Sequence, residues 1–365
     1  MAIDRRTLLG VGVAAASTAL LGKTHAASEI PASRAKRLRR IATEEAWSIP
    51  EHIEALIGIG QTSWDNLDAM SWRPVTAASP LARRLVDIDE RLRIMDQLGV
   101  DMHVLSLTSP GVQMFERAHA VAMAALANDR MAEIIRARPA RFAGLASFAP
   151  QDPARAAKEI ERCVTKLKLN GFIVNSHTNN EYLDLPKYWE IFEAAEALNA
   201  AIYIHPRCPA DTMARPYSDY EMRAAIWGFQ AEVGVHAVRL MLAGVFDRFP
   251  KLTVVLGHMG ENVPFHLWRT DHWFERRRAS YASKLLPSEI FKRNIMITTS
   301  GVEHGPALRY AIEVLGADRI MWAIDYPYEE MPPAVTFMNE VGISESDRAK
   351  VLHENAERVF HIEPA

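Results

Sequence analysis

The chain has 365 residues, of which 49% are hydrophobic and 24% are charged, and its formal net charge at pH 7 is −3. That length suits two domains of ordinary size or one large barrel. The mildly acidic balance gives no reason to expect a nucleic acid or an anionic membrane as a partner.

The first 27 residues have the pattern of an export signal. Arg5 and Arg6 precede a short apolar run, and a small-residue site follows near Ala26. Paired arginines ahead of such a run are typical of twin-arginine signals. A membrane span needs about 20 apolar residues, and this run is shorter. The sequence therefore predicts a cleaved signal peptide over residues 1–27, a linker over residues 28–39, and a periplasmic or otherwise exported mature protein without a membrane span.

From residue 40 onward, short apolar runs alternate with segments of helical period. The runs expected to form buried strands are 40–44, 100–107, 142–148, 171–175, 201–205, 252–258, 294–299 and 319–325. Helix starts are indicated by Asp87, by Asp152 before Pro153, and by Ser344, and Gly99 indicates a helix end. The segment that follows the first strand, up to about Arg84, has no clean period and is interpreted as a loop or lid.

This alternation predicts a parallel sheet, and eight units predict a closed (β/α)8 TIM barrel with lid loops over its carboxyl-terminal mouth. No change in composition marks a second domain, so residues 40–365 are expected to form one. An open doubly wound sheet is the second choice, because no glycine-rich phosphate turn follows the first strand.

Four of the expected strands end on a side chain that can bind metal. These side chains are Glu44, His205, His258 and Asp325. Carboxyl ends of barrel strands meet at one mouth, where such enzymes carry their chemistry. Glu44, His205 and Asp325 form a nitrogen and oxygen set suited to one divalent ion, Mn²⁺ or Zn²⁺. His258 is either a further ligand or a proton-transfer group.

Further candidates surround these four. Glu261 either orients the His258 imidazole or caps the next helix. Arg269 is a candidate for binding a substrate carboxylate, and Arg84 in the lid is a weaker one. Two cysteines, Cys163 and Cys208, are too few for a disulfide framework and are expected to be inert core thiols, with a single disulfide between them left open.

Several motifs carry a resemblance to a known family. They are IHPR at 204–207, GHMGE at 257–261, DYPY at 325–328 and ENAERVF at 354–360. Together, and in this order, they resemble the amidohydrolase-2 group of the amidohydrolase superfamily over roughly residues 40–360. Residues 107–113 and 175–178 add a resemblance to its non-oxidative aromatic acid decarboxylases, such as the γ-resorcylate and 5-carboxyvanillate enzymes.

The resemblance implies roles for these positions. The metal ligands of the family fall on Glu44, His205 and Asp325. Its active-site histidine and glutamate fall on His258 and Glu261, and its arginine falls on Arg269. The family also suggests a homodimer or homotetramer.

One position departs from the pattern of many members. They have Glu-x-His at the first strand, whereas Ala46 stands two residues after Glu44 here. The missing imidazole argues against a binuclear hydrolytic site and favours a mononuclear one.

The resulting hypothesis is decarboxylation of a small ortho-hydroxylated aromatic acid bound to the metal. Asp325 would protonate the ring carbon, while His258 would hold the phenol. Trp47 and Tyr328 either sandwich the ring or are ordinary packing.

Two alternatives remain. The same metal could activate water against a lactone or amide, with His258 or Asp325 as base. A non-enzymatic binding protein on a decayed barrel should have lost one of the four strand-end residues, and all are present.

Overall fold

The structure is a computed structural model that describes residues 37–63 and 66–364. The predicted signal peptide and residues 28–36 of the linker lie outside the described residues. Among the described residues, no helix combines the length and the apolar character that crossing a membrane requires.

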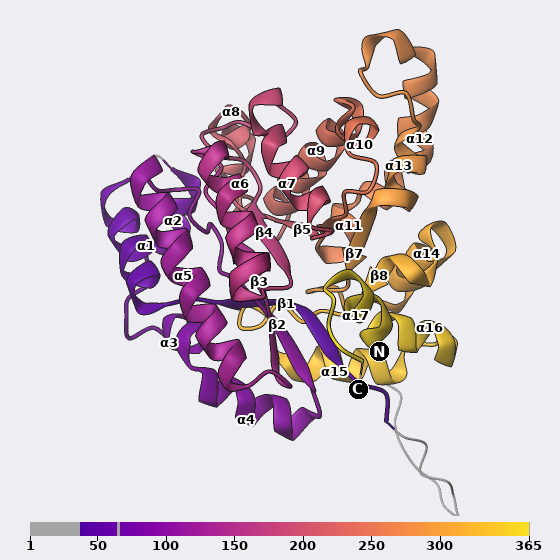
Figure 1. The fold of residues 1–365 in the computed structure, drawn as a ribbon. Coiled ribbons are helices and arrows are strands. Elements are labelled where there is room, and N and C mark those ends of the chain that lie inside the picture. The colour runs from indigo at the N-terminus through magenta and orange to yellow at the C-terminus, as the bar shows by residue number, and fades with distance from the viewer. Residues whose placement is uncertain (1–36, 64–65, 365) are drawn as a thin grey trace, which may run out of the picture. The chain divides into compact units, whose positions relative to one another are not determined.

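The described residues form a barrel of eight parallel strands that follow one another in chain order, from β1 to β8 (Figure 1). The strands are β1 Ile41–Trp47, β2 Met102–Leu107, β3 Phe142–Ser147, β4 Gly171–Asn175, β5 Ile202–His205, β6 Val254–Leu256, β7 Ile295–Thr298 and β8 Ile320–Met321. Beyond β8 the chain returns to β1, because Thr43 N donates to Trp322 O and Asp325 N donates to Glu44 O, each at 3.0 Å. The predicted (β/α)8 barrel is confirmed.

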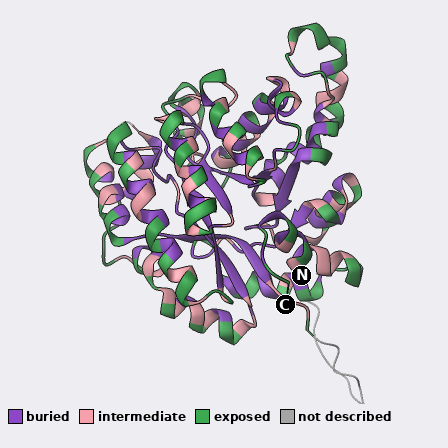
Figure 2. Cartoon of the chain, viewed as in Figure 1, coloured by how far each residue is buried: buried purple, intermediate pink, exposed green. Residues whose placement is uncertain are grey.

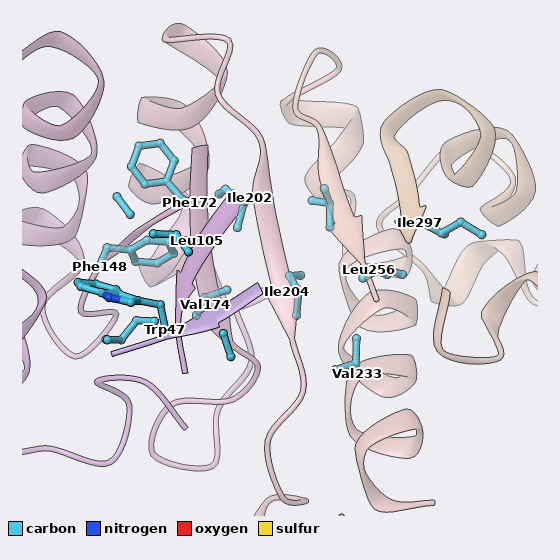
Figure 3. Packing of buried hydrophobic residues seen from close by; sticks show 14 of the residues in the cluster. Trp47, Leu105, Phe148, Phe172, Val174, Ile202, Ile204, Val233, Leu256 and Ile297 are labelled. Carbon is cyan, nitrogen blue, oxygen red and sulfur yellow. The ribbon is translucent and has the colours of Figure 1, made fainter. Parts of the chain in front are cut away.

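Burial explains why the strands are apolar runs without alternation. Every residue of the eight strands is buried (Figure 2). A parallel strand has helices on one face and the barrel interior on the other, so both faces require apolar side chains. The layer between strands and helices includes Leu105, Phe148, Phe172 and Ile204 (Figure 3). A separate cluster that includes Met102, Val255 and Phe360 unites strand residues with the C-terminal segment.

Helices surround this sheet (Figure 1). They are α1 Pro50–Thr62, α2 Leu67–Trp72, α3 Pro80–Val86, α4 Ile88–Leu98, α5 Arg117–Ala137, α6 Pro153–Arg162, α7 Trp189–Ala197, α8 Asp211–Ala214, α9 Gly228–Leu242, α10 Val245–Arg248, α11 His258–Glu261, α12 Val263–Arg276, α13 Pro287–Asn294, α14 Gly305–Leu315, α15 Met331–Glu340, α16 Glu345–Ala349 and α17 Asn355–Val359.

The helix boundaries predicted from capping residues are confirmed. The side chains of Asp87, Asp152 and Ser344 each accept a hydrogen bond from the backbone N–H three residues later. Gly99 ends α4 in the left-handed region, with φ of 67°.

Several boundaries differ from the predictions, and the largest differences are at the first and last strands. The segment over residues 45–84 is not a loop: it completes β1 and then forms α1, α2 and α3. Consequently β1 continues to Trp47, and Glu44 lies inside the strand instead of at its end. The expected strand 319–325 pairs with β7 only over Ile320–Met321, and the rest is extended chain held by other contacts.

Both cysteines are buried and free. Burial raises the pKa of both thiols far above its usual value, so Cys163 and Cys208 are poor nucleophiles.

Candidate active site

Glu44, His205 and Asp325 come together at the carboxyl-terminal mouth of the barrel. They reach it from β1, from the end of β5 and from the chain beyond β8. Each offers one ligand atom, and these atoms all lie within 4.8 Å of one another. The Glu44 Oε1 atom is 3.3 Å from the Nε2 atom of His205. The barrel closure thus assembles residues that are up to 281 positions apart in sequence, as the difference between 44 and 325 shows.

The Glu44 carboxylate is held from one side only. Its Oε2 atom accepts hydrogen bonds from the hydroxyls of Tyr203, Thr298 and Ser300. Its Oε1 atom is buried and has no hydrogen-bond partner among the described residues. Burial alone would raise the pKa of Glu44, but the charge of His258 and the hydrogen bond from Ser300 hold it below its usual range. Glu44 is therefore an anion with one free oxygen facing the mouth.

The His205 ring is oriented by its Nδ1 atom. This atom lies 2.8 Å from the carbonyl oxygen of Pro206 and 3.0 Å from Oδ1 of Asn175. Both partners are acceptors, so Nδ1 carries the proton and the lone pair is on Nε2. This is the tautomer that a metal-binding histidine needs.

The Asp325 carboxylate completes the set. Its Oδ1 atom is buried and, like Glu44 Oε1, has no hydrogen-bond partner among the described residues. Leaving such atoms unpaired costs free energy, and a cation removes that cost. Two free carboxylate oxygens and one imidazole nitrogen fit a divalent ion such as Mn²⁺ or Zn²⁺.

His258 stands beside these three residues. Its Nδ1 atom is 2.7 Å from Oε1 of Glu261, and its Nε2 atom is 3.6 Å from Oδ2 of Asp325. Burial would lower the pKa of His258, but the Glu261 and Glu44 charges raise it well above its usual value. Glu261 is buried, and of the two roles considered for it the contact with His258 is the one observed: Oε1 faces His258, and Oε2 has no hydrogen-bond partner among the described residues.

The turn that carries His258 depends on a glycine. A Cβ atom at Gly257 would lie 2.9 Å from Oε2 of Glu44, which is closer than Cβ atoms approach other groups. Glycine at this position therefore lets β6 end against the Glu44 carboxylate.

A pocket of about 380 Å³ opens over this group and reaches His205, His258 and Asp325. Its volume lies in the range of small-molecule sites. The other described residues that line it are mostly apolar or uncharged: Asp68, Ser71, Trp72, Val75, Leu81, Ser109, Pro110, Pro206, Cys208, Ala224, Ala225, Phe229, Gln230, Gly301, Val302, Tyr328 and Glu329. Such a pocket suits a flat apolar ring whose polar edge faces the carboxylates.

Comparison with known proteins now identifies the family. The model of the amidohydrolase family matches residues 61–362. The chain belongs to this family. It is 37% identical over 340 residues to a γ-resorcylate decarboxylase of Rhodococcus jostii. The aligned region covers 89% of this chain and 99% of that protein.

Solved structures support the assignment of this chain to the amidohydrolase family. The crystal structure of 5-carboxyvanillate decarboxylase from Sphingomonas paucimobilis superposes with a TM-score of 0.87 at 50% identity, covering 90% of this chain and all of that one. A dihydroxybenzoic acid decarboxylase from Polaromonas sp. superposes with a TM-score of 0.79 at 36% identity, covering 90% and 98%. That second structure contains bound manganese and the inhibitor 2-nitroresorcinol.

Of the two aromatic residues expected to hold a ring, only Tyr328 lines the pocket of this amidohydrolase. Its hydroxyl is 2.6 Å from Oγ1 of Thr108, and 43% of its surface is exposed. Trp47 instead lies in the core beside Phe148, with 2% of its surface exposed (Figure 3). Trp47 does not line the pocket, and its position in the core matches the second reading of this residue, ordinary packing.

Neither candidate arginine lines the pocket within this chain. Arg84 forms a two-pronged ion pair with Glu330, at 2.8 and 2.9 Å, and lies over the ring of Tyr326. Its guanidinium is thus engaged by protein groups. Arg269 lies on the exposed side of α12.

The residues that hold the ligands were not anticipated. Tyr203 and Thr298 grip Glu44, and Asn175 orients His205. One signal was available in the sequence: Tyr203 precedes His205 by two positions in β5, and residues two apart in a strand share a face.

Another buried carboxyl group, that of Glu232, fixes the loop after His205. Glu232 of α9 accepts hydrogen bonds from Ser176 Oγ at 3.0 Å, Tyr182 OH at 3.0 Å and Ala210 N at 3.2 Å. Burial raises its pKa to about 7, despite these donors. Ala210 lies in the loop whose first residues line the pocket, so Glu232 connects the loop to the barrel wall.

This raised pKa predicts a pH dependence of stability. The folded protein binds the Glu232 proton more tightly than the unfolded chain does, so protonation contributes about 3 kcal/mol that is fully present below pH 4.5 and lost as the pH rises through 7. Glu232→Gln, which cannot ionise, should gain stability relative to the parent by about 2 to 3 kcal/mol between pH 5 and pH 8. Urea unfolding of metal-free protein at both pH values measures this, with Glu54→Gln on the exposed side of α1 as the control. A difference between variant and parent that does not change with pH would refute it.

Proposed function

We propose that this amidohydrolase is a divalent-metal-dependent carboxy-lyase that removes carbon dioxide from an ortho-hydroxylated aromatic acid. The observation that carries the proposal is the open set of Glu44, His205 and Asp325, with two unpaired carboxylate oxygens beneath a largely apolar pocket. Relatives with this activity support it: the chain is 37% identical to a γ-resorcylate decarboxylase and 50% identical to a 5-carboxyvanillate decarboxylase.

The metal site is assigned to Glu44, His205 and Asp325, and Mn²⁺ is the first choice because a neighbouring decarboxylase structure contains it. When bound, the ion supplies Lewis-acid charge that orients the carboxylate and the ortho hydroxyl of the acid. Zn²⁺ fits the same donor atoms.

Different residues of the chain donate the proton and bind the phenol. Burial raises the pKa of Asp325, so this carboxyl group takes up a proton more readily than an exposed aspartate does. Asp325 gives its proton to the ring carbon that bears the carboxylate. The bond between that carbon and the carboxylate breaks, its electron pair returns to the ring, and carbon dioxide leaves. His258 holds the phenol oxygen through Nε2, and Glu261 fixes the imidazole from the other side.

Hydrolysis of a lactone or amide is the alternative use of the same site, and Ala46 distinguishes the two. Ala46 is buried in β1, two residues after Glu44, where many relatives have histidine. If the site works with one metal, Ala46→His should leave decarboxylation unchanged or lower it by blocking space at the mouth. Assays of the parent and the variant on hydroxybenzoates and on aromatic lactones test this. A large gain in hydrolysis with the added histidine would favour the binuclear hydrolase instead.

We also propose a homodimer or homotetramer. Large apolar side chains are exposed on α9, α12 and the turn before α9: Trp227, Val235, Phe265, Trp268 and Trp273. A monomer seldom leaves so many together, and burial between subunits would remove them from water. Sedimentation of the purified protein as a monomer would refute this.

Export through a twin-arginine signal is proposed from Arg5 and Arg6 and the apolar run after them. A folded, metal-loaded enzyme is a suitable passenger for that route. The mass of the protein recovered from a bacterial periplasm tests it, because a retained N-terminus would refute cleavage near Ala26.

A further inference from the structure

Glu45 follows the ligand Glu44 in β1, and its side chain is fully buried. Its Oε1 atom accepts a hydrogen bond from Ile324 N at 3.0 Å, and its Oε2 atom accepts one from Tyr326 N at 3.3 Å. These two amides flank Asp325. One carboxylate therefore holds the backbone on both sides of the residue that we assign as metal ligand and proton donor.

The amide of Asp325 is also bound to β1. It donates to the carbonyl oxygen of Glu44 at 3.0 Å. Three consecutive amides, those of residues 324–326, thus donate to two consecutive residues of β1. Because the strand pairing of β8 with β7 ends at Met321, these bonds fix a segment that the parallel ladder does not reach.

The backbone of Asp325 needs such support. Its φ is 78°, in the left-handed region that residues with a side chain seldom occupy. A conformation of this kind persists only where the surroundings hold it. Loss of the flanking bonds would let the backbone relax and move the carboxylate away from Glu44 and His205.

The groups around Glu45 keep it in place. His103 Nδ1 on β2 lies 3.5 Å from Oε2 of Glu45. Arg91 of α4 donates to the carbonyl oxygen of Ala46 at 2.5 Å and stacks over the ring of Tyr326, with 4.7 Å between Cζ and the ring centroid. A buried carboxyl group is costly without partners, and both amides that donate to Glu45 belong to the Asp325 segment.

We propose that Glu45 is a positioning residue that acts through Asp325 by clamping the amides on either side of it. The assignment rests on the metal site of the proposed function, but not on which reaction that site catalyses. It gives a buried acid outside the ligand set a role in metal binding and turnover.

The test is the affinity of metal-stripped protein for Mn²⁺, measured by calorimetry without substrate. In Glu45→Gln, the amide nitrogen faces one of the two backbone N–H groups, so one half of the clamp is lost. The dissociation constant for Mn²⁺ should rise about tenfold, as expected when a group that orients a ligand is changed. Glu45→Asp keeps both carboxyl oxygens on a shorter side chain. Its affinity for Mn²⁺ should lie between that of the parent protein and that of Glu45→Gln. Glu159→Gln, at a partly buried glutamate of α6, is the matched control and should bind Mn²⁺ as the parent does.

A double substitution separates positioning from general support of the fold. Since Glu45 acts through Asp325, Glu45→Gln added to Asp325→Gly, which has no ligand atom and tolerates the φ of 78°, should weaken Mn²⁺ binding no further than Asp325→Gly alone. Additive losses would overturn the proposal. So would a Glu45→Gln protein whose melting temperature falls while its Mn²⁺ affinity is unchanged. If Glu45→Gln does not fold, Glu45→Asp provides the same comparison. The predicted affinities with no decarboxylation of any acid would support the clamp and refute only the proposed reaction.

Discussion

Asp325→Asn is expected to lower decarboxylation by about a thousandfold or more, because an amide cannot deliver a proton to the ring carbon. General acid catalysis contributes about 10² to 10⁴ in rate, and here the same side chain also meets the metal. Binding of Mn²⁺ should weaken much less, since the amide oxygen can still face the ion and Glu44 and His205 remain. Steady-state turnover and Mn²⁺ calorimetry on one preparation measure both effects.

Comparing the loss of turnover with the loss of Mn²⁺ affinity shows whether Asp325 is a proton donor or only a ligand. A rate loss no larger than the loss in metal occupancy would make Asp325 only a ligand, and an unchanged rate would remove it from the mechanism. Glu330→Gln is a suitable control, because Glu330 is exposed and pairs with Arg84 outside the pocket.

Glu44→Gln is expected to abolish metal binding at micromolar Mn²⁺. Three hydroxyls donate to Oε2 of Glu44, so the oxygen of the new amide should turn to them. The amide NH₂ group then occupies the place of Oε1 and cannot bind a cation. A ligand and a negative charge are lost together, whereas Asp325→Asn can retain the ligand oxygen.

Thermal unfolding with and without Mn²⁺ checks this prediction. An ion that binds only the folded state stabilises it by about 2.7 kcal/mol at a hundredfold excess over the dissociation constant. The parent protein should therefore melt higher with Mn²⁺, and Glu44→Gln should not. Equal stabilisation of both proteins would place the metal elsewhere.

Much of the fold could be predicted because local signals and tertiary structure agree. The strand runs are apolar on both faces, and the capping residues Asp87 and Asp152 start α4 and α6 where they were expected to. His205 was placed at the end of its strand, where the structure has it. These features depend on residues that are close together in the sequence, so the sequence alone indicates them.

The predictions differ from the structure where contacts between residues far apart in the sequence determine the local conformation. Glu44 and Glu45 look like the end of a strand, yet β1 continues because hydroxyls of β5 and β7 and the amides of residues 324 and 326 satisfy both acids. The three helices after β1 lack a clean period and were missed, since packing against the barrel can stabilise a helix of weak pattern. For Trp47 the sequence left a ring contact and ordinary packing open, because it does not show which face of β1 this side chain occupies.

The measurement that tests the central claim most directly is product analysis by mass spectrometry. Mature protein loaded with Mn²⁺, and separately with Zn²⁺, is incubated with a mixture of ortho-hydroxybenzoates and, in parallel, with aromatic lactones and amides. We expect at least one hydroxybenzoate to lose the mass of carbon dioxide in a metal-dependent reaction. Addition of water to a lactone or amide, with every acid unchanged, would contradict the decarboxylase and show that the site is hydrolytic.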